Sequence, residues 1–408
     1  MKKFPVLFVV IASMLCSCSS DDYLNAIPSD SVALLSVDVA NATGEAKGVN
    51  ATLLKSFFRV SDVSDCGIDL SSKIYLFESP DGTLGLASRV KSSSSVDKWL
   101  CRLSQKGLCQ EPQKRRDLHF TILNNSWLVG FSDNALLVMG PVLPSTQSEL
   151  LRKMTINLHS DEGVKDTPLF DRLESITSPV AIVSQAQALP SQLIAPFTIG
   201  APADTDASQI FISAEIHADK GCLIMDGQTF SFDETVDKSL KQAGSAFRPL
   251  TSRFLPMIPH DALFTIAMNA DGSTLLPLMR QSREFRTLLT GVGVDVDIDK
   301  FIEQVRGDLI ITLPTYNDEH VEMRWAAQLD ESRELLDPES EQHLMNTKMQ
   351  PTSSSLPETV QSNLEGAHQA VLLNLHSLDS DKRQIANIFT SLLKPLFGDV
   401  DYILYRNK

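Results

Sequence analysis

Stretches in which apolar and polar residues alternate recur along most of the chain and predict β-strands. Such alternation places one face of a strand in a core and the other in solvent. The predicted strands are residues 32–39, 73–77, 83–90, 119–123, 126–131, 135–139, 180–184, 209–217, 222–232, 263–268, 308–313, 320–329, 368–375 and 402–405. Asn124-Asn125 and Lys220-Gly221 separate neighbouring strands, and Asn and Gly tolerate the positive φ of hairpin turns. The pattern therefore predicts largely antiparallel sheets.

Other segments show apolar residues at the three-to-four-residue spacing of an amphipathic helix. The predicted helices are residues 53–58, 96–104, 285–289, 299–305, 331–336 and 381–396. Helices interspersed among hairpin-connected strands favour the α+β class. We expect these helices to pack on one face of the sheets.

The first residues have a different pattern, which is typical of a signal peptide. Lys2 and Lys3 precede an apolar run from Phe4 to Leu15 in which Ser13 is the only hydroxyl residue. As a helix this run is about 18 Å long, shorter than the roughly 30 Å hydrocarbon core of a bilayer. We therefore expect residues 1–17 to be removed rather than to span a membrane.

The sequence Leu15-Cys16-Ser17-Cys18 resembles a bacterial lipobox, in which the cysteine after a small residue is lipidated. Cys18 is the predicted lipidation site, because Cys16 would follow the bulky Leu15. Several acyl chains on one cysteine give durable anchoring. The alternative is an ordinary secretory signal cut nearby.

An acidic segment, Ser19-Ser20-Asp21-Asp22, follows Cys18 and is interpreted as a tether. It resembles the tag that sends some Bacteroidetes lipoproteins to the cell surface. We expect an outer-membrane lipid anchor, and the sequence leaves the periplasmic and the cell-surface faces equally open.

The elements of the mature chain follow one another in the same order twice, as β-α-β-β-α. An I-P-x-D turn opens each copy, at residues 27–30 and 258–261, and G-[IV]-D-[LV] follows at residues 67–70 and 293–296. This correspondence predicts an internal duplication. The expected segments are a signal peptide (1–17), an acidic tether (18–26), a first α+β repeat (27–157), a middle segment with a β-hairpin (158–250) and a second repeat (251–408).

Charge and cysteine content narrow the classes of partner. The formal net charge is −15, which repels phosphate backbones, so we expect no binding to nucleic acid. Cys66, Cys101, Cys109 and Cys222 lack the spacing of a metal site. One or two disulfides remain open, Cys66 with Cys101 or Cys109 among them, although buried thiols are favoured.

The usual catalytic signatures are missing from the sequence, which contains no G-x-S-x-G, H-E-x-x-H or P-loop motif. Gly130-Phe131-Ser132 lacks the second glycine of a nucleophile elbow. A triad is assembled in space, so an enzyme is not excluded. We expect no cofactor, no metal and no catalytic residue.

Other chemistry-bearing residues have plainer explanations. Asp295, Asp297 and Asp299 suggest calcium, but Lys300 occupies the position where an EF-hand requires glycine. His217, His260 and His376 are expected at strand ends or turns. The tryptophans, which are Trp99, Trp127 and Trp325, are expected in the core, with an exposed glycan platform as the alternative.

The lipobox, the segment from Tyr23 to Leu34, the repeated I-P-x-D turn and the segment from Asp133 to Gly140 together resemble a family of Bacteroidetes lipoproteins known as domain of unknown function 4836. The resemblance extends over nearly the whole mature chain. It implies an envelope location and an α+β fold, and it supplies no functional residues.

These observations favour a non-enzymatic envelope lipoprotein that binds or assembles other components, with an envelope protein, a glycan or a lipid as partner. The alternative is a periplasmic or surface hydrolase with a site between the repeats. A carrier of lipid or another hydrophobic ligand is a third hypothesis, which requires a large apolar cavity.

Overall fold

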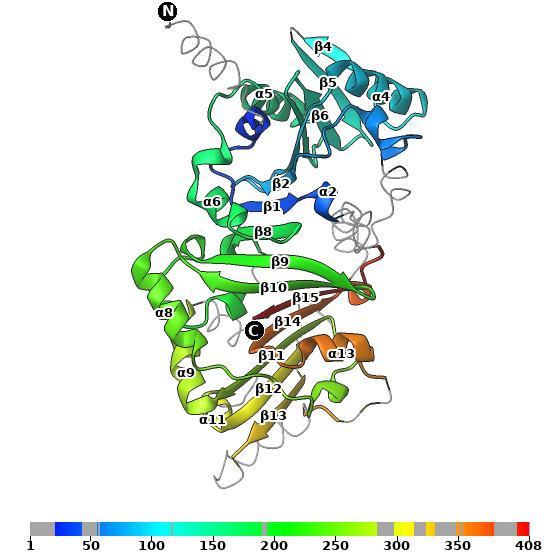
Figure 1. Ribbon diagram of the computed structural model, residues 1–408. Helices are drawn as coiled ribbons and strands as arrows, with labels where there is room; N and C mark the ends of the chain where they lie inside the picture. Colours follow the sequence, from blue (N-terminus) through cyan, green and yellow to red (C-terminus); the bar gives the residue numbers. More distant parts are fainter. Residues whose placement is uncertain are drawn as a thin grey trace, which may run out of the picture. The chain divides into compact units, whose positions relative to one another are not determined.

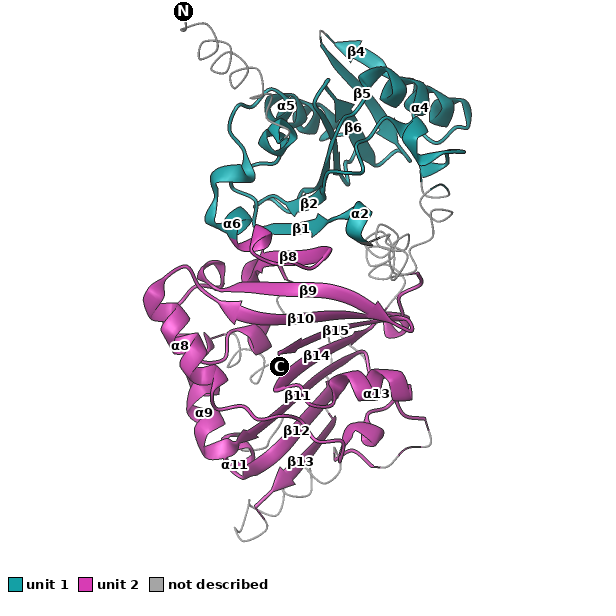
Figure 2. Ribbon diagram, in the orientation of Figure 1, with its two compact units in different colours: residues 1–41, 54–171 teal, residues 42–53, 172–408 magenta. Residues whose placement is uncertain are grey.

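The computed structural model describes residues 21–42, 55, 58–115, 117–189, 194–283, 298–313, 324–330, 348–350, 352, 354–378 and 398–407 (Figure 1). The chain divides into two compact units (Figure 2). Unit 1 contains Met1–Asn41 and Leu54–Asp171, and unit 2 contains Ala42–Leu53 and Arg172–Lys408. Both units combine helices with a mostly antiparallel sheet, which confirms the predicted α+β class.

The sheet of unit 1 is antiparallel throughout, in the order β1-β2-β3-β7-β6-β5-β4. Its strands are β1 (Ala33–Val37), β2 (Ile74–Glu78), β3 (Leu84–Arg89), β4 (Gln113–Arg115), β5 (Leu118–Leu123), β6 (Trp127–Phe131) and β7 (Ala135–Gly140). The turn between β5 and β6 is Asn124-Asn125, where both residues have positive φ, 49° and 58°. The expected hairpin turn is therefore confirmed.

Helices lie on both faces of this sheet. They are α2 (Val39–Ala42), α4 (Ser93–Gln105), α5 (Gln147–Leu158) and α6 (Pro168–Glu174), with 3-10 turns η1 (Asp22–Ala26), η2 (Val63–Cys66) and η3 (Val164–Asp166). Helix α4 packs on the face that carries Val129 and Phe131. Helix α5 packs on the opposite face, where Met154 fills the space above Gly130.

The sheet of unit 2 has the order β13-β12-β11-β14-β15-β10-β9-β8. Its strands are β8 (Val180–Gln185), β9 (Phe211–Asp219), β10 (Cys222–Phe230), β11 (Phe264–Asp271), β12 (Val305–Leu313), β13 (Arg324–Leu329), β14 (Gln369–Asn374) and β15 (Tyr402–Asn407). Strands β10 and β15 are parallel, and the other neighbouring pairs are antiparallel. Lys220 and Gly221, both with positive φ, form the β9–β10 turn as expected.

Helices cover both faces of this sheet as well. They are α8 (Glu234–Gly244), α9 (Gly272–Gln281), α11 (Ile298–Glu303) and α13 (Glu358–Leu364), with 3-10 turns η4 (Ala186–Ala188), η5 (Ala195–Phe197), η6 (Ala207–Gln209), η7 (Leu255–Met257) and η8 (Leu375–Ser377). Leu275 of α9 and Phe301 of α11 pack with Ile266 of β11. Val360 and Leu364 of α13 pack against the other face of the same sheet.

The predicted packing of helices on one face is therefore wrong in both units. Most described strands and hairpins agree with the alternation to within a few residues, whereas α5, α8, α9 and α13 had no counterpart among the predicted helices. The predicted helices at 285–289, 331–336 and 381–396, and four of the six residues of 53–58, lie outside the described residues. In the part of the chain that is described, no helix has the length and apolar content needed to cross a bilayer.

A close approach of β2 to β3 gives a test of this packing. Phe77 lies opposite Gly85, and a Cβ atom on Gly85 would be 2.0 Å from the Phe77 ring. Because the Phe77 ring is buried and must shift to admit the new methyl group, we expect Gly85→Ala to lower the free energy of unfolding by about 1–3 kcal/mol. Urea denaturation measures this change.

The matched control is Gly244→Ala at the end of α8, where an added Cβ meets nothing within 4 Å. That variant should keep the stability of the parent. Equal stability of the parent and the Gly85→Ala variant would contradict the packing of Phe77 on Gly85.

Candidate functional site

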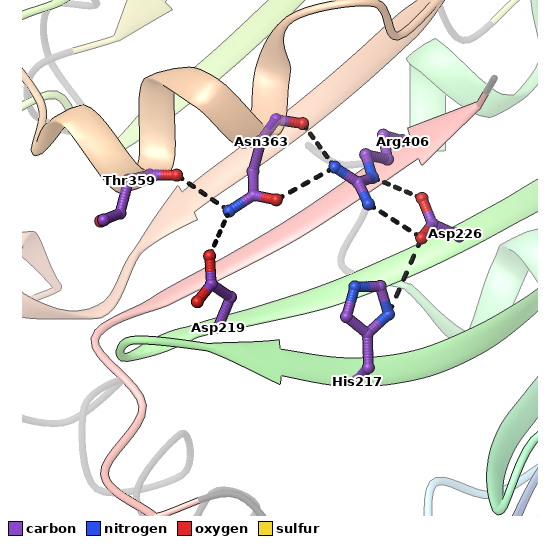
Figure 3. Close-up of polar contacts among 6 residues, drawn as sticks. All are labelled: His217, Asp219, Asp226, Thr359, Asn363 and Arg406. Atoms are coloured by element: carbon purple, nitrogen blue, oxygen red, sulfur yellow. Dashed lines mark hydrogen bonds and ion pairs between the residues drawn. The ribbon is translucent and has the colours of Figure 1, made fainter.

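A polar cluster among the described residues of unit 2 centres on Arg406 of β15 (Figure 3). Its side chain is only 7% exposed. The parallel register places Arg406 opposite Asp226 of β10. Residues opposite each other in neighbouring strands project from the same face, so the pairing of two backbones determines that these charges meet.

Arg406 uses its guanidinium group in two directions (Figure 3). Nε and Nη2 donate to the two carboxylate oxygens of Asp226, with an Nη2–Oδ2 distance of 2.9 Å. Nη1 donates to the backbone oxygen of Asn363 at 2.8 Å and to its side-chain oxygen at 3.2 Å. The bidentate contact fixes the orientation of the guanidinium plane.

Asn363 extends the cluster from α13 to the hairpin. Its amide nitrogen donates to Asp219 of β9 at 3.2 Å and to the backbone oxygen of Thr359 at 2.8 Å. One asparagine thereby accepts from β15 and donates to β9. The cluster therefore attaches the C-terminal turn of α13 to both strands.

His217 of β9 is the member of the cluster that is most open to solvent. Its side chain is 48% exposed, and its Nδ1 lies 3.7 Å from Oδ2 of Asp226. That distance is an ion-pair contact for a protonated imidazole and too long for a good hydrogen bond. His217 therefore lies at the edge of the cluster, beside the hydrogen bonds that join Arg406 to Asp226 and Asn363.

This geometry favours a structural role for the cluster. An anionic ligand would have to displace Asp226 or Asn363 from Arg406, and removing either partner leaves a buried charge poorly compensated. Asp308 of β12 follows the same pattern, since it is buried and accepts from the backbone nitrogen of Thr251 at 3.2 Å and from the amide of Asn269 at 2.8 Å. Both carboxylates are occupied by neighbours within the fold.

Several residues singled out from the sequence fall outside the described ranges, among them Cys18, Asp295 and Asp297. Asp299, in the first turn of α11, accepts from Arg280 at 3.1 and 2.5 Å. Within the described ranges, no group of three His, Cys, Asp or Glu residues is placed to hold a metal ion.

The other histidines singled out occupy turns and strand ends. His376 follows β14 and lies 2.8 Å from Asp401. His260 shares a 2.7 Å hydrogen bond with Ser354. Each has a partner that accounts for its position.

The tryptophans contribute to packing. Trp325 is buried and its ring meets Phe301 edge-on at 4.7 Å. Trp99 donates its indole N–H to the backbone oxygen of Phe58 at 2.8 Å. Trp127 lies against Gly140 and is half-buried. These contacts support the core interpretation over an exposed aromatic platform.

Sequence reasoning missed Arg406, Asp226 and Asn363. A usable signal was present, because Cys222, Ile224 and Asp226 share one face of β10, and Leu404 and Arg406 share one face of β15. A charge on a strand position in register with buried residues requires a partner. The identity of that partner depends on a parallel pairing that the local pattern does not reveal.

Comparison with known proteins identifies the family of this chain. The family model described as Domain of unknown function (DUF4836) matches residues 23–325, which confirms the expected family resemblance. The match ends in β13, whereas we expected nearly the whole mature chain. A search of curated proteins finds no match.

Solved structures with some similarity include crystal forms of TP0453. Form I is 11% identical with a TM-score of 0.30, and the alignment covers 48% of this chain and 74% of that one. Form III is 12% identical with a TM-score of 0.29, covering 48% and 75%. Similarity of this size carries no argument about function.

Replacing Arg406 tests the structural interpretation of the cluster. Arg406→Met should lower the free energy of unfolding by about 3 kcal/mol, because it removes the partner of Asp226 and two bonds to Asn363. Chemical denaturation checks this, and the double variant with Asp226→Asn should lose less than the sum of the two single changes.

The matched control is Arg280→Met, which breaks the more exposed ion pair with Asp299, where the side chains are 58% and 44% exposed. A change of at most about 1 kcal/mol is expected there. If Arg406→Met lowered the free energy of unfolding no more than Arg280→Met does, the structural role of the Arg406 cluster would be contradicted.

Proposed function

We propose that this chain, which belongs to the family described as Domain of unknown function (DUF4836), is a lipid-anchored protein of the bacterial cell envelope. In this proposal it binds or helps to assemble other envelope components and carries out no catalysis. The observation that carries the proposal is the N-terminal sequence, in which Cys18 follows a signal-peptide pattern and a small residue.

The composition of the chain supports an exported binding protein. The net charge of −15 suits a solvated body and disfavours binding to phosphate backbones. Asp21 follows the proposed lipid site after two serines and Asp22 begins η1, so the proposed tether between the membrane and η1 is short and acidic. The proposed location is the outer membrane of a member of the Bacteroidetes, with the protein on its periplasmic or outer face.

The chemistry of the described clusters also favours binding over catalysis. Arg406 and Asp308 are buried and held by neighbouring residues, so neither is poised to react with a substrate. A general acid or base requires a titratable group that can reach a bound substrate. Binding through exposed side chains requires no such group.

The duplication of residues 27–157 and 251–408 forms part of the proposal. Three antiparallel strands in chain order, β1-β2-β3 and β11-β12-β13, begin after the two I-P-x-D turns. The later strands differ, because β7 joins β3 whereas β14 joins β11. In this proposal an ancestral three-stranded unit was copied and then extended differently.

Metabolic labelling with a fatty acid tests the anchor. We expect the parent chain to incorporate label and to partition with membranes, and Cys18→Ala to lose both properties because the acylated thiol is gone. The matched control is Cys16→Ala, which removes the neighbouring thiol and should retain the label. Full labelling of Cys18→Ala would overturn the assignment.

A separate measurement addresses catalysis. The purified chain is incubated with peptidoglycan, glycans, phospholipids and peptides, and the products are analysed by mass spectrometry. Binding without turnover agrees with the proposal. Turnover of one of these substrates that is lost in a point variant would replace it with the hydrolase hypothesis.

A further inference from the structure

Two half-exposed cysteines lie close together at the end of α4. Cys101 is in the third turn of this helix, and Cys109 follows the helix by four residues. Gly107, with φ 70°, reverses the chain after the helix, and the backbone nitrogen of Leu108 donates back to Leu103 at 3.0 Å. This glycine-based cap brings Cys109 back alongside the helix that contains Cys101.

One contact shows how close the two residues are. Sγ of Cys109 donates to the carbonyl oxygen of Leu100 at 3.4 Å, and that carbonyl carbon is bonded to the nitrogen of Cys101. Standard peptide geometry then places Sγ of Cys109 within about 6 Å of the Cα atom of Cys101. Within a disulfide the sulfur of one cysteine lies closer than this to the Cα atom of the other, so the bond requires rotation of the two side chains together with a shift of the loop that carries Cys109 toward α4.

The other described cysteines are placed differently. Cys66 is fully buried, and its thiol donates to the backbone oxygen of Val63 at 2.9 Å. Cys222 is fully buried in β10 of unit 2, with Ile224 and Leu404 in the same core cluster. Neither thiol is presented to an oxidant in solution, which distinguishes them from Cys101 and Cys109.

We propose that Cys101 and Cys109 are a redox-active pair that forms an intramolecular disulfide. This inference goes beyond the proposed function and does not require it, since any small disulfide such as oxidised glutathione serves as the oxidant. The cross-link would join the third turn of α4 to the extended segment that bridges β5 through Cys109 and Leu123.

The reaction is two consecutive thiol–disulfide exchanges. The thiolate of one cysteine attacks a sulfur of oxidised glutathione, forms a mixed disulfide and releases one glutathione. The second cysteine thiolate attacks the protein sulfur of that mixed disulfide and releases the other glutathione. Two protein thiols lose two electrons and two protons, and two glutathione thiols gain them.

The surroundings of the pair determine how the experiment is run. Burial raises the pKa of the Cys101 thiol, and the Asp97 and Glu111 carboxylates raise it further. Burial also raises the pKa of Cys109, against a smaller opposite effect of the Thr121 hydroxyl. Because the thiolate is the attacking species, exchange is best measured at about pH 8.5 rather than at neutral pH.

The test uses the full chain carrying Cys16→Ser and Cys18→Ser, so that the N-terminal thiols do not compete. The protein is reduced, freed of reductant, incubated with oxidised glutathione, quenched with acid and alkylated. Peptide mass mapping should show a linked peptide pair containing Cys101 and Cys109. Thermal unfolding of this oxidised form should have a midpoint roughly 5 °C above that of the reduced form.

Single replacements separate the outcomes. Cys101→Ser and Cys109→Ser should each stop at one glutathione adduct and lose the shift in midpoint, whereas Cys66→Ser should still form the linked pair. Two stable adducts on Cys101 and Cys109 without a cross-link, or a cross-link to Cys66 or Cys222, would overturn the proposal. The proposal would also be overturned if the peptide mass map after incubation with oxidised glutathione were identical to that of the reduced protein.

Discussion

Strand β15 lies between β14 and β10, and its pairing with β10 is the connection on which the sheet of unit 2 depends. On one side are β11 to β14, and on the other are β8 to β10. The register that joins these two groups runs in parallel from Cys222 with Tyr402 to Asp226 with Arg406. Strand β15 therefore joins two groups of strands that otherwise pair within themselves in unit 2, and the paired residues Asp226 and Arg406 are 180 positions apart in the sequence. Loop closure over such a distance is costly, so the pairing needs strong support from side chains.

The Arg406 cluster supplies that support and limits what else the residues can do. Apolar residues, Ile224 and Leu404 among them, fill the core beside it. A guanidinium group in that environment is tolerated only if its donors are satisfied, which Asp226 and Asn363 achieve together. Because the geometry is bidentate, the contact also favours one register over a shift by one residue, which would turn Arg406 to the opposite face. The contact between Arg406 and Asp226 thus both compensates a buried charge and selects the register of β15 on β10.

The sequence alone was sufficient for features that depend on local chemistry. Asn124-Asn125 and Lys220-Gly221 adopt positive φ where hairpins were expected, and alternation located most described strands. Some missed helices also had local signals, since Asp233 and Asp271 accept hydrogen bonds from the first turns of α8 and α9. Pro277 inside α9 interrupts the pattern and hides that helix. The N-terminal prediction for Cys18 concerns residues outside the described ranges and stays a prediction.

Features that depend on tertiary pairing could not be read from the sequence in this way. The periodicity of a helix shows which side is apolar but not which face of a sheet it covers, so α4 and α5 gave no sign that they pack on opposite faces. The parallel β10–β15 pair is hidden because a strand covered on both sides carries apolar residues on both faces, whether its neighbour runs parallel or antiparallel. Arg406 and Asp226 lie far apart in the chain, and neither has a distinctive motif around it. The candidate site was missed because its residues meet only when β15 pairs with β10. The same strand pairing leaves Arg406 and Asp226 bonded within the fold rather than open to a ligand. In the described part of the chain, a binding surface is therefore best sought among exposed side chains. A ligand that contacts them does not have to displace the bonds of Arg406 that hold β15 in place.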